Sequence, residues 1–193
     1  MELATTDPDD TRRLAGAVAH VLRPGDVVAL TGELGAGKTC FVQGVARALG
    51  VTDRVTSPSF LLRRDYEGTV PIVHLDVYRL ETLHEALDLD WGEEAERALV
   101  LIEWGDAVRA VLPDEHLEVE LRLAEPATAP PAREADDALA AAEPRRVRLI
   151  ARGPGWQRRL EHLAAAVAPW RSGDPAPADA VPPRAPHEGV QRC

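Results

Sequence analysis

The octet Gly32-Glu33-Leu34-Gly35-Ala36-Gly37-Lys38-Thr39 carries the clearest structural signal in this chain of 193 residues. It fits the pattern G-x-x-x-x-G-K-[ST], in which glycines let successive backbone N–H groups turn inward around a phosphate. Lys38 is the only lysine of the chain and offers a compact ammonium to the β and γ phosphates. Thr39 offers a hydroxyl to Mg²⁺ at the positive end of the helix that begins there. The octet therefore predicts a phosphate-binding loop.

The flanking residues have the pattern that such a loop requires. The segment from Asp26 to Thr31 is a short apolar run, which indicates a buried strand before the loop. After the loop, apolar residues at helical spacing lead to a glycine that can end a helix: Phe41, Val42, Val45, Leu49 and Gly50. Strand, loop and helix follow in the expected order, so an incidental glycine-rich turn is a poor alternative.

Composition limits the remaining possibilities. The length suits one domain with a proper core. A formal net charge of −10 opposes non-specific attraction to nucleic acid, so any RNA is expected to be held by a partner. No run of 18 apolar residues occurs and the first ten residues are acidic, which predicts neither a membrane span nor a signal peptide. Cys40 and Cys193 are the only cysteines, so a disulfide scaffold is not expected. We expect a cytosolic location.

A first helix is predicted before the loop, because Asp7 can cap it and Pro8 suits its first position. Its expected buried stripe consists of Leu14, Val18, Val21 and Leu22. Beyond the loop helix, strands are predicted for Phe60–Tyr66, Val70–Asp76 and Ala98–Ile102, and helical spacing extends from Leu80 to Leu89. The first two strands are expected to join at a Glu67-Gly68 turn, and the third, continuously apolar, to be buried on both faces.

The last third of the chain alternates between ordered and low-complexity segments. Strict alternation in Leu117–Leu123 predicts a strand with one wet face, and Arg146–Ala151 predicts another strand. A helix should follow, with an apolar stripe of Trp156, Leu160, Leu163 and Val167. Residues 124–144, rich in Ala, Pro and Glu, are expected to form a flexible insertion, and residues 171–193 a disordered tail. Residues 1–170 would then form the single folded domain.

Two carboxylates follow predicted buried strands and could serve a nucleotide site. Glu103 follows the more continuous apolar run and is the first choice for the shell of a metal ion, while Asp76 could orient an attacking water or be a second metal ligand. Either acid could instead cap backbone groups at a strand end. His74 lies two residues before Asp76 on the same strand face and is either a packing residue or part of the site.

Several motifs of other nucleotide-binding proteins are absent from the sequence. Without a second lysine, the chain cannot build the Asn/Thr-Lys-x-Asp element that reads guanine. It also has neither the Leu-Ser-Gly-Gly-Gln segment of transporter ATPases nor an H-x-x-x-H zinc pair. Guanine specificity by the Asn/Thr-Lys-x-Asp route is therefore excluded.

Four motifs in register resemble the bacterial TsaE (YjeE) family, the ATPase component that supports threonylcarbamoyladenosine formation in tRNA. They are the octet at 32–39, Thr-Ser-Pro-Ser-Phe at 56–60, His-Leu-Asp-Val-Tyr-Arg-Leu at 74–80 and Leu-Ile-Glu-Trp-Gly-Asp at 101–106. The resemblance extends from about Glu2 to Leu123 and, more loosely, to Val167.

The resemblance implies a role for each matching residue. The residues implied in ATP binding are Thr11, near the base or ribose, and Gly32, Glu33, Leu34, Gly35, Ala36, Gly37, Lys38, Thr39 and Cys40. Thr39 and Glu103 are similar to the Mg²⁺ ligands of the family, and Lys38, Asp76 and Glu103 would be catalytic. Ser57, Pro58, Ser59 and Phe60 resemble a switch loop that responds to the γ-phosphate. Arg79 would make a structural or partner contact, and Trp104 is similar to a tryptophan beside the metal-binding acid.

These expectations combine into one hypothesis. The chain would be a cytosolic, Mg²⁺-dependent ATPase with an α/β fold like that of P-loop NTPases: three layers, with a mixed, mostly parallel sheet flanked by helices. By resemblance it would act on an assembly of TsaB and TsaD and meet tRNA only through these partners. Two alternatives remain open, namely a small-molecule kinase and an ATP-sensing assembly subunit that does not hydrolyse ATP.

Overall fold

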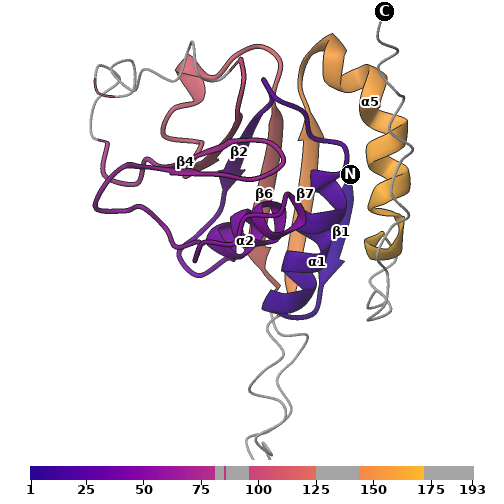
Figure 1. The fold of residues 1–193 in the computed structure, drawn as a ribbon. Helices are drawn as coiled ribbons and strands as arrows, with labels where there is room; N and C mark the ends of the chain where they lie inside the picture. The colour runs from indigo at the N-terminus through magenta and orange to yellow at the C-terminus, as the bar shows by residue number, and fades with distance from the viewer. Residues whose placement is uncertain (81–84, 86–95, 125–143, 172–193) are drawn as a thin grey trace, which may run out of the picture.

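The computed structural model describes residues 1–80, 85, 96–124 and 144–171. Within these residues, seven strands form one sheet in the order β1-β7-β6-β2-β5-β4-β3 (Figure 1). The strands are β1 (Glu2–Thr5), β2 (Val27–Thr31), β3 (Arg63–Tyr66), β4 (Ile72–Asp76), β5 (Leu99–Glu103), β6 (Leu117–Leu123) and β7 (Arg145–Ala151). The helices are α1 (Pro8–Ala19), α2 (Lys38–Ala48) and α5 (Gly153–Ala166), with short 3-10 turns η1 (Arg109–Val111) and η3 (Ala168–Trp170).

The centre of the sheet is parallel and its two sides are antiparallel. β4, β5, β2 and β6 pair in parallel, whereas β3 joins β4, β7 joins β6 and β1 joins β7 in antiparallel fashion. The prediction of a mixed α/β sheet is confirmed, although parallel pairing is confined to the centre. Because β4 and β5 run in register, Asp76 pairs directly with Glu103 and both acids lie at the same sheet edge.

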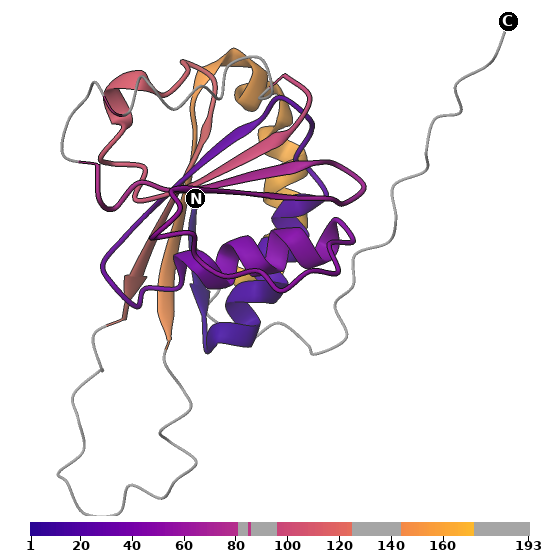
Figure 2. The same ribbon diagram turned by 60° about the vertical axis from the view of Figure 1, so that its left-hand side comes forward.

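Each face of the sheet has its own hydrophobic core. Helices α1, α2 and α5 share the larger core with β2, β5, β6 and β7, and Figure 2 shows α1 and α2 crossing beside the sheet. A smaller cluster around Val100 and Ile102 on the other face is covered by residues 104–112, which include η1. Among the described residues, α1, α2 and α5 thus pack into the larger core only. On the second face, where a helical layer was expected, the described residues include the short 3-10 turn η1.

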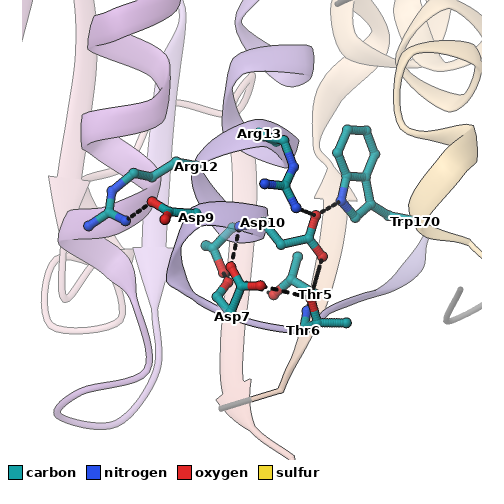
Figure 3. A network of polar contacts seen from close by, with 9 residues as sticks. Thr5, Thr6, Asp7, Asp9, Asp10, Arg12, Arg13 and Trp170 are labelled. Carbon is teal, nitrogen blue, oxygen red and sulfur yellow. Dashed lines mark hydrogen bonds and ion pairs between the residues drawn. The ribbon is translucent and has the colours of Figure 1, made fainter. Parts of the chain in front are cut away.

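The start of α1 follows its sequence signals closely. Asp7 caps the helix by accepting a hydrogen bond of 2.7 Å from the backbone N–H of Asp10, and Pro8 takes the first position. Asp10 itself is fully buried and accepts from the indole Nε1 of Trp170 at 2.9 Å and from Arg13 at 3.1 Å (Figure 3). This carboxylate therefore fastens the end of η3 to the beginning of α1, a long-range contact that the capping pattern does not reveal.

The strands differ from the sequence predictions in three places. β1 was not predicted; its four residues pair with β7 at the sheet edge and are too few to show a pattern. β3 begins at Arg63 and not at Phe60, because residues 60–62 form a turn in which the N–H groups of residues 61 and 62 donate to Pro58. In β6, Glu118 lies on the face predicted to be wet but is only 5% exposed.

Other predictions fall wholly or partly outside the described residues. They are the helical spacing from 80 to 89, the flexible insertion at 124–144 and the disordered tail at 171–193. α1 ends at Ala19, so Val21 and Leu22 lie beyond the helix, yet Leu22 is still buried in the core. Ranges of the other helices and strands agree with the sequence patterns to within a few residues.

Candidate functional site

The octet forms a loop between β2 and α2, and three of its glycines adopt positive φ angles: 140° at Gly32, 82° at Gly35 and 105° at Gly37. At Gly32 a Cβ atom would lie 2.1 Å from the backbone oxygen of Leu121, so a side chain there is excluded by sterics as well as by φ. Gly37 is the N-cap of α2 and has no side chain that could cap the first backbone N–H groups of this helix. An anion site requires such N–H groups to be uncapped.

Lys38 lies inside the loop that carries it. Its Nζ donates hydrogen bonds to the backbone oxygens of Gly32, at 2.8 Å, and Glu33, at 2.9 Å, and lies 3.5 Å from the ring centroid of Trp104. Burial lowers the pKa of Lys38, and the nearby acids Glu103 and Asp76 oppose that shift. An ammonium bound to two neutral carbonyl oxygens can exchange them for phosphate oxygens, because hydrogen bonds between two charged partners are stronger.

Glu103 links three elements at the end of β5. The Thr39 hydroxyl of α2 lies 2.9 Å from each of its carboxylate oxygens, and Nε2 of His74 on β4 lies 3.0 Å from Oε1. Glu103 is 3% exposed and His74 is fully buried. Two oxygen ligands, one neutral and one anionic, thus stand together at the start of α2.

Asp76 lies beside Glu103 and is held by the segment that follows α2. Its Oδ2 accepts a short hydrogen bond from the Ser57 hydroxyl and one of 2.8 Å from the Ser59 hydroxyl. Its Oδ1 accepts from the backbone N–H of Tyr78 at 3.2 Å. The predicted switch loop therefore contacts the predicted water-orienting acid directly, which no local sequence pattern indicated.

A cavity of about 500 Å³ joins these groups. Its lining includes most of the predicted site residues: Leu34, Gly35, Gly37, Lys38, Thr39, Cys40, Ser57, Ser59, Phe60, Asp76, Tyr78, Arg79, Glu103 and Trp104. Large apolar side chains stand exposed around its mouth, with Leu34 84% exposed and Phe60 85% exposed. The Arg79 guanidinium stacks over the Phe60 ring at 4.5 Å.

Trp104 has an unusual backbone conformation next to the metal-binding candidate. Its φ of 64° is positive, and its ring packs against Tyr78 with centroids 4.8 Å apart. A bulky residue in the left-handed region costs about 1–3 kcal/mol and persists only when its surroundings hold it. Trp104 therefore both packs on Tyr78 and supports the Lys38 ammonium, so the packing and functional interpretations of this residue coincide.

Some predicted site residues do not face the cavity. Thr11 is fully buried, and its hydroxyl contacts Thr5 at 2.9 Å and the backbone oxygen of Asp7 at 3.1 Å, so the structure does not bring it to this cavity. Gly32, Glu33, Ala36 and Pro58 belong to the two loops without lining the cavity. Glu33 instead accepts a hydrogen bond of 3.0 Å from the backbone N–H of Leu123.

A magnesium nucleotide fits the donor set. Mg²⁺ is commonly held by one or two protein oxygens together with substrate phosphates and water, and Thr39 and Glu103 offer such a pair. No group of three or more His, Cys, Asp or Glu side chains suited to a metal occurs in the described residues. The phosphates would therefore have to complete the coordination shell. In the same part of the chain, no helix is long and apolar enough to cross a membrane.

A glycine loop between a central parallel strand and a helix, with an acid at the end of the neighbouring strand, defines the class of P-loop NTPase-like α/β proteins. The family model described as "Threonylcarbamoyl adenosine biosynthesis protein TsaE" matches residues 5–132. The chain belongs to the TsaE family, and the resemblance seen in its motifs is confirmed.

Individual relatives agree with this assignment. The TsaE protein of Bacillus subtilis is 40% identical over 121 residues, which cover 62% of this chain and 76% of the relative. Those of Treponema pallidum and Mycobacterium tuberculosis H37Rv are 39% and 41% identical, over 64% and 58% of this chain and 92% and 73% of the relatives. The crystal structure of YdiB from Bacillus subtilis superposes with a TM-score of 0.67 and 29% identity, covering 86% of this chain and 94% of that one.

Proposed function

We propose that this chain is a magnesium-dependent subunit that binds and hydrolyses ATP in the formation of threonylcarbamoyladenosine in tRNA. The observation that carries the proposal is the meeting of Lys38, Thr39 and Glu103 at one cavity in a chain of the TsaE family. The names of the relatives indicate the pathway, and the residues that line the cavity indicate the chemistry.

The loop and Lys38 would bind the triphosphate. Open backbone amides at the start of α2 and the Lys38 ammonium would neutralise charge that builds on the phosphate oxygens during transfer. Thr39 and Glu103 would hold Mg²⁺, which supplies charge neutralisation across the β and γ phosphates when bound. All three residues line the cavity.

Asp76 would orient the attacking water. In the present structure the hydroxyls of Ser57 and Ser59 occupy its Oδ2, so the carboxylate is engaged by the switch loop. Hydrolysis would therefore require this loop to release Asp76, which links phosphoryl transfer to a conformational change. Coupling of this kind suits a subunit that drives or resets an assembly.

The proposed partners are TsaB and TsaD, by family resemblance, and the proposed location is the cytoplasm. A formal charge of −10 disfavours direct binding to tRNA, so contact with tRNA would run through these partners. The base chemistry itself would then belong to the partners.

The engaged Asp76 also favours one alternative, an ATP-sensing subunit that binds without hydrolysis. Reconstituted tRNA modification with TsaB and TsaD separates the possibilities when free phosphate is measured alongside modified tRNA. The hydrolytic proposal expects phosphate release that the partners stimulate, and loss of both products with Glu103→Gln. Modified tRNA at the wild-type level without phosphate release would establish the sensor. Phosphate appearing on an added metabolite instead of free would establish a small-molecule kinase.

A further inference from the structure

His74 is a buried polar residue between the apolar residues Val73 and Leu75 of β4, and packing alone does not explain it. The ring is fully buried on β4, and its Nδ1 has no hydrogen-bond partner among the described residues. A buried polar atom without a partner costs about 1–3 kcal/mol, which an apolar side chain would avoid. Residues that break a local rule at such a cost concentrate at functional sites.

The compensating contact lies at the other ring nitrogen. Nε2 is 3.0 Å from Oε1 of Glu103, and because a carboxylate only accepts, this contact assigns the ring proton to Nε2. Nδ1 then carries a lone pair without a partner, and a buried N–H without an acceptor at this position would be unfavourable as well. His74 therefore acts as a hydrogen-bond donor to Glu103.

The geometry of the sheet makes this contact possible. His74 lies two residues before Asp76, and Asp76 pairs with Glu103 across β4 and β5. Glu103 is therefore a diagonal neighbour of His74 across β4 and β5, within reach of a long side chain. The fully buried ring thus contacts Glu103 without lining the cavity.

The contact with His74 gives the two carboxylate oxygens of Glu103 different surroundings. Oε1 contacts both His74 and the Thr39 hydroxyl, whereas in the described part of the chain Oε2 contacts the Thr39 hydroxyl and not His74. A threonine hydroxyl has one O–H and two lone pairs, so Thr39 could bind a cation through a lone pair but can donate its single hydrogen to only one oxygen of Glu103 at a time. His74 would then be a second donor to Glu103, one that holds Oε1 from a position that does not line the cavity.

We infer that His74 is a positioning residue for the magnesium site: its Nε2–H holds Oε1 of Glu103 and so presents Oε2 to the cation. The inference rests on the proposed function, since it concerns the same Mg²⁺ and nucleotide. Donors of this kind behind a metal ligand alter metal affinity by about 10- to 100-fold when they are removed.

The test uses three substitutions at one position. His74→Leu removes the donor, His74→Asn carries an amide one methylene too short, and His74→Gln places an amide N–H near the position of Nε2. His116→Leu is the matched control, because His116 is also largely buried and contacts a glutamate, Glu118, at 3.3 Å, but does not line the cavity.

Calorimetry would measure binding of the non-hydrolysable analogue AMP-PNP to the full chain at increasing Mg²⁺ concentrations. We expect the half-saturating Mg²⁺ concentration to rise about 10- to 100-fold in His74→Leu and His74→Asn, and to return to within a few-fold of wild type in His74→Gln. Nucleotide binding without Mg²⁺ should be unchanged in all three, and His116→Leu should match wild type in both measurements.

The outcomes distinguish the inference from the proposed function. If wild-type binding depends on Mg²⁺ but the Gln and Asn variants do not differ, the positioning role is wrong while the magnesium site stands. If wild-type binding shows no Mg²⁺ dependence, the proposed function fails and the inference fails with it. Thermal unfolding of each variant shows whether the chain is folded, and the comparison of Gln with Asn holds even if Leu is unstable.

Discussion

Lys38 offers the most direct test of nucleotide binding, because its ammonium sits between two loop carbonyls that phosphate oxygens would replace. We expect Lys38→Met to weaken ATP binding about 10- to 100-fold, the effect of losing one hydrogen bond to a charged group. Lys38→Arg should not restore binding, because a planar guanidinium does not fit the loop. Calorimetric affinities check this, with Arg47→Gln at the exposed end of α2 as control. Wild-type affinity in Lys38→Arg would contradict it.

Asp76 provides a test of hydrolysis that is separate from binding. Asp76→Asn keeps the shape and can still contact Ser57 and Ser59, but it removes the negative oxygen that would orient water. We expect the rate of phosphate release with partners present to fall by about 10²- to 10⁴-fold, the usual contribution of a positioned base. ATP affinity should change little. Equal rates for Asn and wild type would leave Asp76 as a structural partner of the switch loop alone.

The crossing of α1 and α2 depends on one glycine. A Cβ atom on Gly44 of α2 would lie 2.3 Å from the backbone oxygen of Arg12 and 2.7 Å from Cβ of Ala15. We expect Gly44→Ala to lower the free energy of unfolding by about 1–3 kcal/mol, because the helices must separate. Gly16→Ala is the matched control, since its Cβ would meet nothing closer than 3.8 Å and alanine favours a helix by about 1 kcal/mol over glycine.

Urea unfolding of these two variants and the wild type measures both effects. The two substitutions are chemically identical and both lie inside helices, so they differ only in the space available. The order of stability should be Gly16→Ala, then wild type, then Gly44→Ala. An equal gain in both variants would show that the helices can move apart without loss. Because α2 begins at the nucleotide loop, Gly44→Ala should also weaken ATP binding.

At the scale of the whole molecule, features that depend on neighbouring residues could be predicted from the sequence more readily than contacts between distant residues. The octet, the Asp7 cap and the apolar run of β5 depend on residues close together in the sequence, so their patterns predicted the elements correctly. The common edge of Asp76 and Glu103 also followed, because parallel strands align their carboxyl ends.

The features that sequence patterns missed depend on distant partners. β1 forms because its residues pair with β7. Glu118 is buried because His116 and Arg152 hydrogen-bond to it. Asp10 is buried because the indole N–H of Trp170 donates a hydrogen bond to it. The contact between His74 and Glu103 had only one signal, the two-residue spacing from Asp76. Resemblance placed Thr11 near the nucleotide, whereas its hydroxyl is turned toward β1 in this structure.

Glu118, near the beginning of β6, contributes to the pH dependence of folding. Burial by itself would raise the pKa of Glu118, but hydrogen bonds from Arg152 and His116 and the charges of Arg152 and Arg109 lower it below its ordinary 4.5. Because the folded pKa lies below the unfolded one, the ionised carboxylate stabilises the fold fully above pH 4.5. That stabilisation is lost as the pH falls through the folded pKa.

Glu118→Gln should therefore lower the free energy of unfolding at pH 7 by about 1 kcal/mol, a modest value because the Arg152 side chain is 50% exposed. The difference from wild type should shrink steadily below pH 4.5, where the wild-type carboxyl takes up a proton. Urea unfolding from pH 7 to pH 3 measures it, with Glu120→Gln on the same strand as control, since Glu120 meets the exposed Arg148 only at 3.7 Å. A difference that stays constant across this range would mean that Glu118 acts through its shape and not through its charge.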